Sequence, residues 1–478
     1  MTGPDTEARR QERRRAWLIG LALLCCYAFF FYRGGNWNVE ARNAQIVALA
    51  ENHTVAIDSY HEWTGDKAFY RGHYYSDKLL GPSLVAVPFY WISRQLLAPL
   101  LGDFTLAMML SLRVANLAAN ALPTALLGAF LYLFLGRLGL APARRVWVVF
   151  AYGVGTLAFP YSTALFGHQL GGVCAAAAFM LLWHPQHEWR LPRALAAAAL
   201  IGLGAICDFT AIFVSCCLVF YALWVASGRP RGTPVGAARL LARLAPFAVV
   251  AALPVAVQLG VNWACFGSPF VLPQVHSVQE EFRARHTAGL FGLHLPQLCP
   301  LYQVTFGPAR GLFYGSPVLL LALPGIALLW KRHRAEAIFI AAVWLAVTLM
   351  HSGYDLWSGG SSYGPRFQIA VLGLLAIPLA AAAQRWPLMF KALAAVSIFF
   401  MLAVTAHSPF MPEGLRDPLA IALAGFSSGL LIHGNLGLAI GLPGLFSLLP
   451  LVAAQFAFLY ALSGLRDRET QPPATTPD

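Results

Sequence analysis

Apolar stretches recur along the whole chain and are separated by shorter polar segments. The first runs from Ala16 to Tyr32 and the last from Leu445 to Leu462. Each is about as long as an α-helix that crosses a hydrocarbon core of roughly 30 Å. The pattern predicts an all-α polytopic membrane protein with about 11 to 13 transmembrane helices, accompanied by helices and loops beside the outer membrane surface.

Three longer polar segments interrupt the apolar pattern, at 33–81, 265–310 and 351–366. Within the first, Val39 to Glu51 predicts a helix along the outer interface, with Asn38 as its N-cap. The apolar segment Pro82 to Leu101 is short and contains Arg94, so we expect it to dip into the membrane or lie flat. The expected organisation is a basic tail (1–15), a transmembrane domain (16–463) and a disordered C-terminal tail (464–478).

Charge is scarce and unevenly placed: 58% of the residues are hydrophobic and 11% are charged, with a net charge of +12. Most Lys and Arg lie in the N-terminal tail and in short loops that fit one side of the membrane. The positive-inside rule makes that side cytoplasmic and puts the three polar segments outside. The basic charge therefore orients the chain and does not indicate a nucleic-acid partner. The excess of Arg over Lys favours a bacterial inner membrane.

The cysteines give little information about function. Six of the eight lie in apolar spans, where small side chains pack helices together. Cys265 and Cys299 share one outer segment, and whether they pair stays open because spacing alone does not decide it.

The first outer segment contains an acid and a lysine in positions that suit chemistry. Glu40 lies in the first turn of the expected helix, where it serves either the helix dipole or an acceptor hydroxyl as a general base. Asp77 and Lys78 follow Tyr74 and Tyr75 just before an apolar segment. Lys78 either snorkels to lipid headgroups or is a fixed cation for a lipid-linked phosphate.

The other two outer segments add further candidate cations. The glycine-rich stretch from His351 to Arg366 lets backbone amides approach an anion, and Arg366 begins the next span. His286 and Arg310 are candidate phosphate ligands, whereas Arg283 and Arg285 fit a solvated surface. In the apolar sequence, Arg113 and Asp208 fit ion pairing or turn capping.

These motifs together resemble the GT-C membrane glycosyltransferases that take sugars from polyprenyl-phosphate donors. Relatives of that kind are protein O-mannosyltransferases, lipid A aminoarabinose transferases and the core transferases of rhizobia. The resemblance rests on Glu40 with Arg42, on Tyr74 to Lys78, on Phe306 to Phe313 and on Gly359 to Arg366. Several relatives have Asp where this chain has Glu40.

The resemblance implies transfer of a sugar to a cell-envelope acceptor (a lipid, a glycan or a protein) outside the membrane. It implies that Glu40 is the base and that Lys78, Arg366 and Arg310 bind the donor phosphate. It implies no cofactor and leaves a divalent metal open. The implied sugar or acceptor site comprises Arg42, Asp58, His73, Tyr74, Tyr75, Asp77, Tyr354, Asp355 and Tyr363.

Two other functions fit the residues less well. A transporter or flippase of a lipid-linked saccharide requires polar groups near the middle of the bilayer, and the spans here contain few charges. An envelope scaffold without catalysis leaves the clustered outer acids, lysines and glycines unexplained. Glycosyl transfer is the interpretation that the sequence favours.

Overall fold

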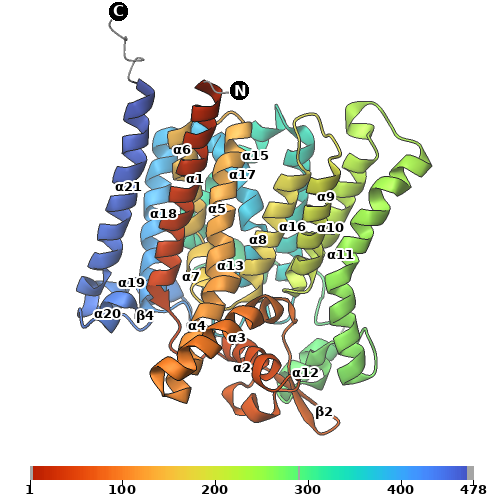
Figure 1. The fold of residues 1–478 in the computed structure, drawn as a ribbon, viewed down its shortest axis with the longest axis vertical. Helices are drawn as coiled ribbons and strands as arrows, with labels where there is room; N and C mark the ends of the chain where they lie inside the picture. The colour runs from red at the N-terminus through yellow and green to blue at the C-terminus, as the bar shows by residue number, and fades with distance from the viewer. Residues whose placement is uncertain (1–3, 289–290, 471–478) are drawn as a thin grey trace, which may run out of the picture.

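The computed structural model describes residues 4–288 and 291–470, and these are mostly α-helical (Figure 1). Eight helical stretches among them are long and apolar enough to cross a membrane, and four shorter apolar helices accompany them. The predicted class, an all-α polytopic membrane protein, is confirmed.

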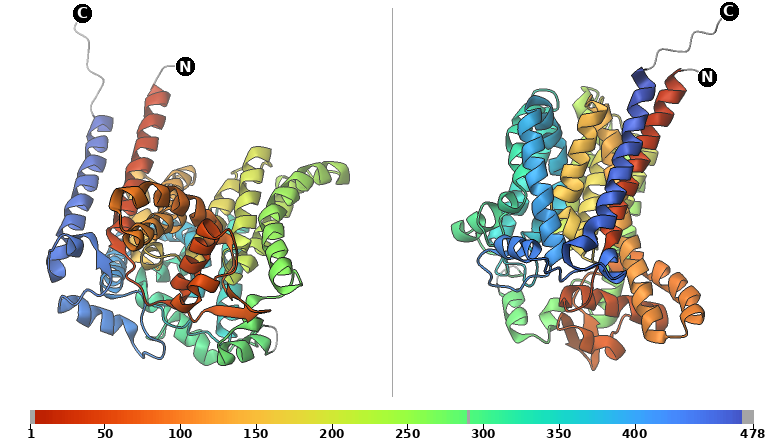
Figure 2. Two further views of the ribbon diagram at one scale, coloured as in Figure 1. Left: turned by 60° about the horizontal axis from the view of Figure 1, so that its bottom comes forward. Right: turned by 90° about the vertical axis from the view of Figure 1, so that its left-hand side faces the viewer.

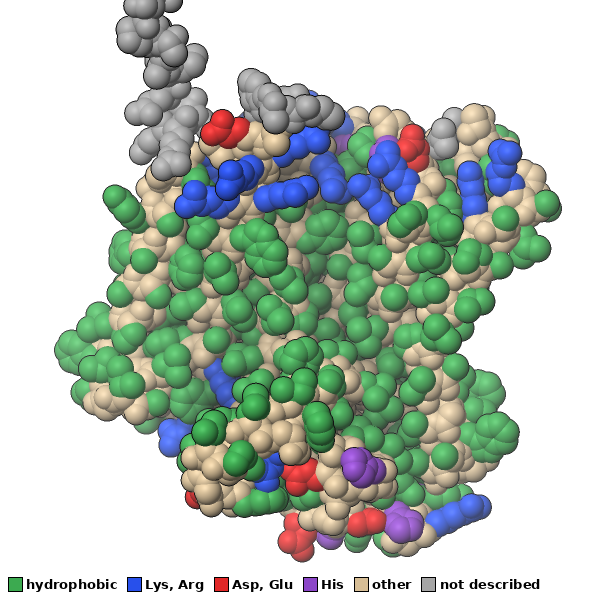
Figure 3. Space-filling view, viewed as in Figure 1, with side chains coloured by type: hydrophobic (Ala, Val, Ile, Leu, Met, Phe, Trp, Pro, Cys, Tyr) green, Lys and Arg blue, Asp and Glu red, His purple; other side chains and the backbone are tan. Residues whose placement is uncertain are grey.

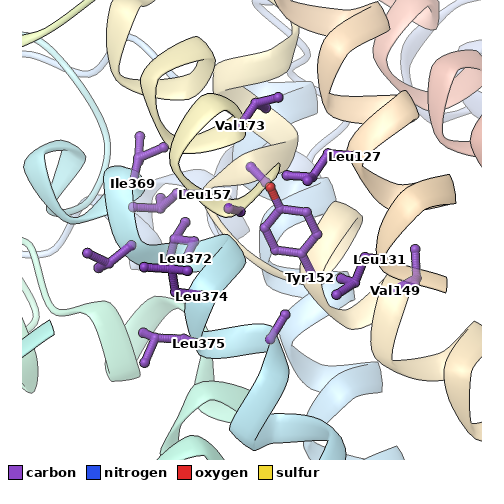
Figure 4. Close-up of a cluster of buried hydrophobic side chains, with 14 of the residues drawn as sticks. Leu127, Leu131, Val149, Tyr152, Leu157, Val173, Ile369, Leu372, Leu374 and Leu375 are labelled. Carbon is purple, nitrogen blue, oxygen red and sulfur yellow. The ribbon is translucent and has the colours of Figure 1, made fainter. Parts of the chain in front are cut away.

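A bundle of roughly parallel and antiparallel helices forms the body of the molecule (Figure 1). Its apolar side chains meet in one large core, to which α5, α6, α8 and α17 contribute (Figure 4). Small residues let these helices approach closely, because a Cβ on Gly373 would lie 2.6 Å from that of Ala176. The bundle helices are α1 (Pro4–Phe29), α5 (Leu122–Arg137), α6 (Pro142–Gly155), α8 (Gly167–Leu182), α9 (Leu191–Ala205), α10 (Phe209–Ala226), α11 (Ala237–Phe266), α15 (Ala322–Trp330), α16 (Arg334–Ser352), α17 (Ile369–Arg385), α18 (Pro387–His407) and α21 (Leu449–Thr470).

Shorter elements gather at one end of this bundle, drawn at the bottom of Figure 1 (Figure 2). They come mainly from the first and second polar segments of the sequence. The first segment contributes α2 (Trp37–Glu51), a 3-10 turn (Asp58–Trp63), β2 (Lys67–Tyr70) and β3 (His73–Ser76), and is followed by α3 (Gly81–Leu101) and α4 (Phe104–Asn116). The later chain contributes a 3-10 turn (Pro273–His276), α12 (Glu280–Thr287), α13 (Leu298–Thr305), α14 (Leu312–Gly315) and the 3-10 turn Arg366–Gln368.

Helix α2 begins earlier than the sequence suggested. Asn36, not Asn38, is its N-cap, because the Asn36 side chain accepts hydrogen bonds from the N–H groups of Asn38 and Val39. The side chain of Asn38 is therefore free to bind Arg42. The predicted cap was wrong by two residues, and the reason is that both asparagines suit the position.

Helix α3 is the segment expected to dip or lie flat. It packs mainly against α2 and α4 at the lower end of the molecule (Figure 2). Only 22% of its apolar stretch is buried inside the protein. A π-helical turn at Leu117–Ala121 joins α4 to α5, so the helix is continuous from Phe104 to Arg137.

The C-terminal part of the chain packs against its N-terminal part. Strand β1 (Phe30–Phe31) pairs antiparallel with β4 (Gly434–Asn435). Ahead of β4 lies α19 (Pro418–Ser427), and after it come α20 (Leu436–Ala439) and a 3-10 turn (Gly444–Leu448). Helix α21 continues to Thr470, past the predicted start of the disordered tail at 464. The rest of that tail, 471–478, lies outside the described residues.

The two ends of the molecule differ in their charged side chains. Lys and Arg gather in a band at the end where both termini lie, and a belt of hydrophobic side chains follows below it (Figure 3). Part of the predicted basic tail belongs to α1, which is helical from Pro4. Cys265 and Cys299 are both free, as are the other six cysteines.

Candidate active site

A cavity of about 350 Å³ lies where the first polar segment (33–81) meets the helix ends of the bundle. Elements that are far apart in the sequence contribute to its wall, and nearly all its ionisable groups come from loops or first helical turns. The lining residues are Gly35, Asn36, Trp37, Asn38, Arg42, Asp66, Asp77, Lys78, Leu79, His168, Cys207, Asp208, Phe209, Gln274, Phe282, His286, Tyr354, Leu356, Gly359, Gly360, Ser361, Arg366, Phe367 and Glu413.

Helix α2 presents Arg42 to the cavity. Arg42 Nη1 donates to the backbone oxygen of Asn38 at 3.0 Å and to its side-chain Oδ1 at 2.5 Å. Gly167 leaves room for this guanidinium, because a Cβ there would lie 2.8 Å from Arg42 Nη2. Burial lowers the pKa of Arg42 to about 10, opposed by Asp208 and Asp77, so Arg42 is a cation at neutral pH.

The β2–β3 hairpin places two carboxylates around one lysine. Lys78 Nζ lies 2.7 Å from Asp66 Oδ2 and 2.9 Å from Asp77 Oδ1. Burial raises the pKa of Asp77, and Lys78 lowers it only in part. Gln274 Nε2 donates to the backbone oxygen of Asp77 and connects the second polar segment (265–310) to this cluster. The three side chains have one positive charge against two carboxylates.

A buried His–Asp pair forms another part of the wall. His168, at the start of α8, lies with Nδ1 2.8 Å from Asp208 Oδ1. Asp208 is also the N-cap of α10 and accepts from the Thr210 N–H at 2.9 Å. The sequence suggested pairing or turn capping for Asp208, and the structure shows both.

Arg366 faces the cavity without a charged partner. It makes no salt bridge with any residue that the structure describes, and its buried Nε has no hydrogen-bond partner there. Gly359 has a φ of +72°, and a Cβ on it would lie 3.2 Å from Arg366 Nε. The glycine-rich loop thus makes space for an unpaired guanidinium, which is suited to bind an anion.

Tyr354 and His286 line the cavity together. The Tyr354 hydroxyl lies 3.0 Å from His286 Nε2. Burial raises the pKa of Tyr354 to about 12, so its hydroxyl keeps its proton at neutral pH. Both residues were candidates from the sequence.

Arg310, expected to bind phosphate, does not line the cavity. Its Nε donates to the backbone oxygen of Ser358 at 2.6 Å, and its Nη2 donates to that of Gly360 at 3.3 Å. It therefore supports the loop that contains Arg366. Tyr363, another candidate, is buried beside this loop, and its backbone oxygen accepts from the Tyr161 hydroxyl.

Four candidates of the first segment lie away from the cavity. Asp58 accepts from the Tyr74 N–H at 2.6 Å and lies 2.7 Å from His73 Nδ1. Partial burial raises the pKa of Asp58, but these hydrogen bonds outweigh it and leave the pKa below its usual value. Tyr74 stacks on His61, and Tyr75 packs against Phe266. In the third segment, Asp355 lies outside the cavity too, 3.0 Å from His294 Nε2.

Glu40 is near the cavity but is not one of its lining residues. Its Oε2 accepts a hydrogen bond from Asn43 Nδ2 at 3.1 Å, on the same helix. The acids that line the cavity are Asp66, Asp77, Asp208 and Glu413, and of these only Asp77 was a sequence candidate for the site. The role of Glu40 as a base stays a prediction.

No protein-family model matches the chain, and no curated protein matches it. Among solved structures, the chain is similar to the crystal structure of ArnT from Cupriavidus metallidurans bound to undecaprenyl phosphate, with 16% sequence identity and a TM-score of 0.39. The alignment covers 94% of this chain and 70% of that chain.

Proposed function

We propose that this chain is a membrane glycosyltransferase that transfers a sugar from a polyprenyl-phosphate donor to a cell-envelope acceptor. The observation that carries the proposal is the cavity itself. An unpaired guanidinium, Arg366, and a second buried guanidinium, Arg42, line the same cavity as a lysine held by two carboxylates. Such a site offers fixed positive charge for a leaving phosphate and carboxylates for proton removal.

The proposed reaction makes one bond and breaks one. A carboxylate removes the proton of an acceptor hydroxyl, and the oxygen forms a bond to the anomeric carbon of the sugar. The bond between that carbon and the phosphate oxygen breaks, and the lipid phosphate leaves with the electron pair. Arg366 and Lys78 are the proposed phosphate ligands, because both line the cavity and a fixed cation stabilises the negative charge of a leaving phosphate.

Asp66 is the proposed base. Its Oδ2 contacts Lys78, whereas its Oδ1 accepts no hydrogen bond from a described residue, and the side chain is 17% exposed. Asp208 is bound by His168 and Thr210, and Glu413 accepts from the Ser358 hydroxyl. Glu40, which the resemblance favours, is the second candidate.

Sugar transfer is expected in membranes that contain the chain and not in membranes that lack it. The donor is a polyprenyl-phosphate sugar with a radiolabel in the sugar, and the measurement follows label into envelope lipid, glycan and protein fractions. Label that crosses the bilayer while it remains on its polyprenyl carrier would instead support the transporter.

The cavity is proposed to face outward. The support is the band of Lys and Arg at the other end of the molecule, because basic loops stay in the cytoplasm (Figure 3). Cys299 is exposed and lies at the start of α13, in the second outer segment.

A variant whose only cysteine is Cys299 is therefore expected to react with a membrane-impermeant maleimide in intact spheroplasts. The matched control is a variant whose only cysteine is at position 144 (Arg144→Cys), an exposed position in the first turn of α6, which is expected to react only after lysis. The reverse labelling pattern would place the cavity in the cytoplasm.

A further inference from the structure

A second cavity, of about 410 Å³, lies between the C-terminal half of α2 and the middle of α3. It shares no lining residue with the candidate active site. The proposed glycosyl transfer gives it no role. Its lining residues are Ala50, Glu51, His53, Tyr90, Trp91, Arg94, Gln95 and Ala98.

Arg94 provides an unused donor in this cavity. Its side chain is only 9% exposed, and its Nε lies 3.0 Å from Glu51 Oε1. The guanidinium also packs over the ring of Phe104, 4.2 Å from the centroid. Its Nη1 is buried and has no hydrogen-bond partner among the residues described. A buried guanidinium N–H without an acceptor is costly, which indicates that an external acceptor binds there.

Glu51 provides an unused acceptor beside that donor. Its Oε1 accepts from both Arg94 Nε and the Tyr90 hydroxyl. Its Oε2 accepts no hydrogen bond within the described chain, and the side chain is 24% exposed. Among the described residues, the cavity therefore contains one guanidinium N–H group without an acceptor and one carboxylate oxygen without a donor.

The surroundings of the cavity are apolar and exposed. On α3, Trp91 is 50%, Ile92 52% and Leu96 62% exposed, and on α4, Phe104 is 61% and Met109 59% exposed. Figure 3 shows hydrophobic side chains over this part of the face, next to charged side chains. An apolar surface of this kind, bordered by Trp and charge, is typical of the headgroup level of a bilayer.

We propose that this cavity binds the headgroup of a zwitterionic phospholipid of the phosphoethanolamine type. The phosphate accepts from the Arg94 guanidinium, and the ammonium donates to Glu51 Oε2. An anionic headgroup without an amine leaves the Glu51 carboxylate beside a second negative charge. A choline headgroup has no N–H to donate.

Occupancy of this site would hold one end of α2. Glu51 is the last residue of α2, and the first turns of the same helix line the candidate active site. The lipid therefore binds to the helix that presents Arg42, and it fixes the depth of that helix relative to the membrane surface.

Native mass spectrometry of the full-length protein tests the proposal, by titrating it in detergent with phosphatidylethanolamine, phosphatidylglycerol or phosphatidylcholine of equal chain length. The wild type is expected to bind phosphatidylethanolamine about tenfold more tightly than the other two, because one charge-assisted hydrogen bond changes the affinity by about that factor. Arg94→Met is expected to lose about tenfold in that affinity. Glu51→Gln keeps an acceptor for Tyr90 and is expected to bind the ethanolamine and glycerol lipids equally.

The matched control is Arg71→Met, which removes an exposed arginine at the tip of the β2–β3 hairpin and is expected to change none of these affinities. Equal binding of the three lipids by the wild type would overturn the proposal. So would an unchanged ethanolamine preference in Glu51→Gln, a test that holds even if Arg94→Met fails to fold. Displacement of the lipid by soluble phosphoethanolamine or inorganic phosphate at equal concentration would assign the site to a soluble phosphate compound instead.

Discussion

Replacing Lys78 with methionine is expected to lower the rate of sugar transfer by about 100- to 1,000-fold. Lys78 is the proposed cation for the leaving phosphate, and methionine keeps the length of the side chain but removes its charge. The variant also leaves Asp66 and Asp77 without the cation that both of them contact. The donor phosphate would then meet two uncompensated carboxylates, which raises the barrier further. Initial rates with labelled donor in membranes measure the effect.

Lys67→Met is the matched control, because the same hairpin contains a second lysine with different contacts. Lys67 Nζ donates to the backbone oxygen of His61 at 2.6 Å and does not line the cavity. Its replacement is expected to change the rate by less than about threefold, while Lys78→Arg is expected to keep part of the activity. Equal losses in Lys67→Met and Lys78→Met would show that the hairpin matters only for folding.

Single polar residues that interrupt an apolar pattern were predictable from the sequence. Lys78, Asp77 and Arg366 each lie at the edge of an apolar span, and all three line the cavity. A charge at a span end needs a partner or a ligand, so local sequence was enough to single these residues out. The same reasoning applies to the helix from Val39 to Glu51, whose existence was predicted correctly although its cap was not.

Asp66 was missed because its position depends on strand pairing. In the hairpin, Lys67 pairs with Ser76, and the Asp77 N–H donates to the Asp66 backbone oxygen, so the two aspartates lie opposite each other. Arg71 and Gly72 form a two-residue turn with positive φ at both positions. The signal was present: the dipeptide Asp-Lys occurs twice, at 66–67 and 77–78, on both sides of this turn.

Local reasoning singled out Asp208 but could not identify His168 as its partner. They start two different helices, and only the packing of α8 against α9 and α10 brings them within 2.8 Å. Arg310 shows the opposite case: it was a sequence candidate, but it is not one of the residues that line the cavity. Its motif predicted a phosphate ligand, but the glycine-rich loop has backbone carbonyls that need donors, and Arg310 provides them.

The second large effect is expected from replacing the proposed base. Asp66→Asn is expected to lower kcat by about 100- to 10,000-fold, because an amide of nearly the same shape cannot take the proton of the acceptor hydroxyl. The donor should still bind, since Lys78, Arg42 and Arg366 remain, so the KM for the donor is expected to change little. Asp66→Glu restores a carboxylate and is expected to recover part of the rate. Steady-state kinetics with labelled donor separate kcat from KM.

Two variants of the same segment serve as comparisons. Asp58→Asn removes an aspartate that binds the Tyr74 N–H and lies outside the cavity, and it is expected to retain most of the activity. Glu40→Gln tests the base that the family resemblance favours. If Glu40→Gln lost kcat while Asp66→Asn kept it, the base would be Glu40, and α2 would have to bring its carboxylate to the cavity when donor binds. If both lost kcat alike, proton removal would depend on the two carboxylates together, with Asp66 at the cavity and Glu40 beside it.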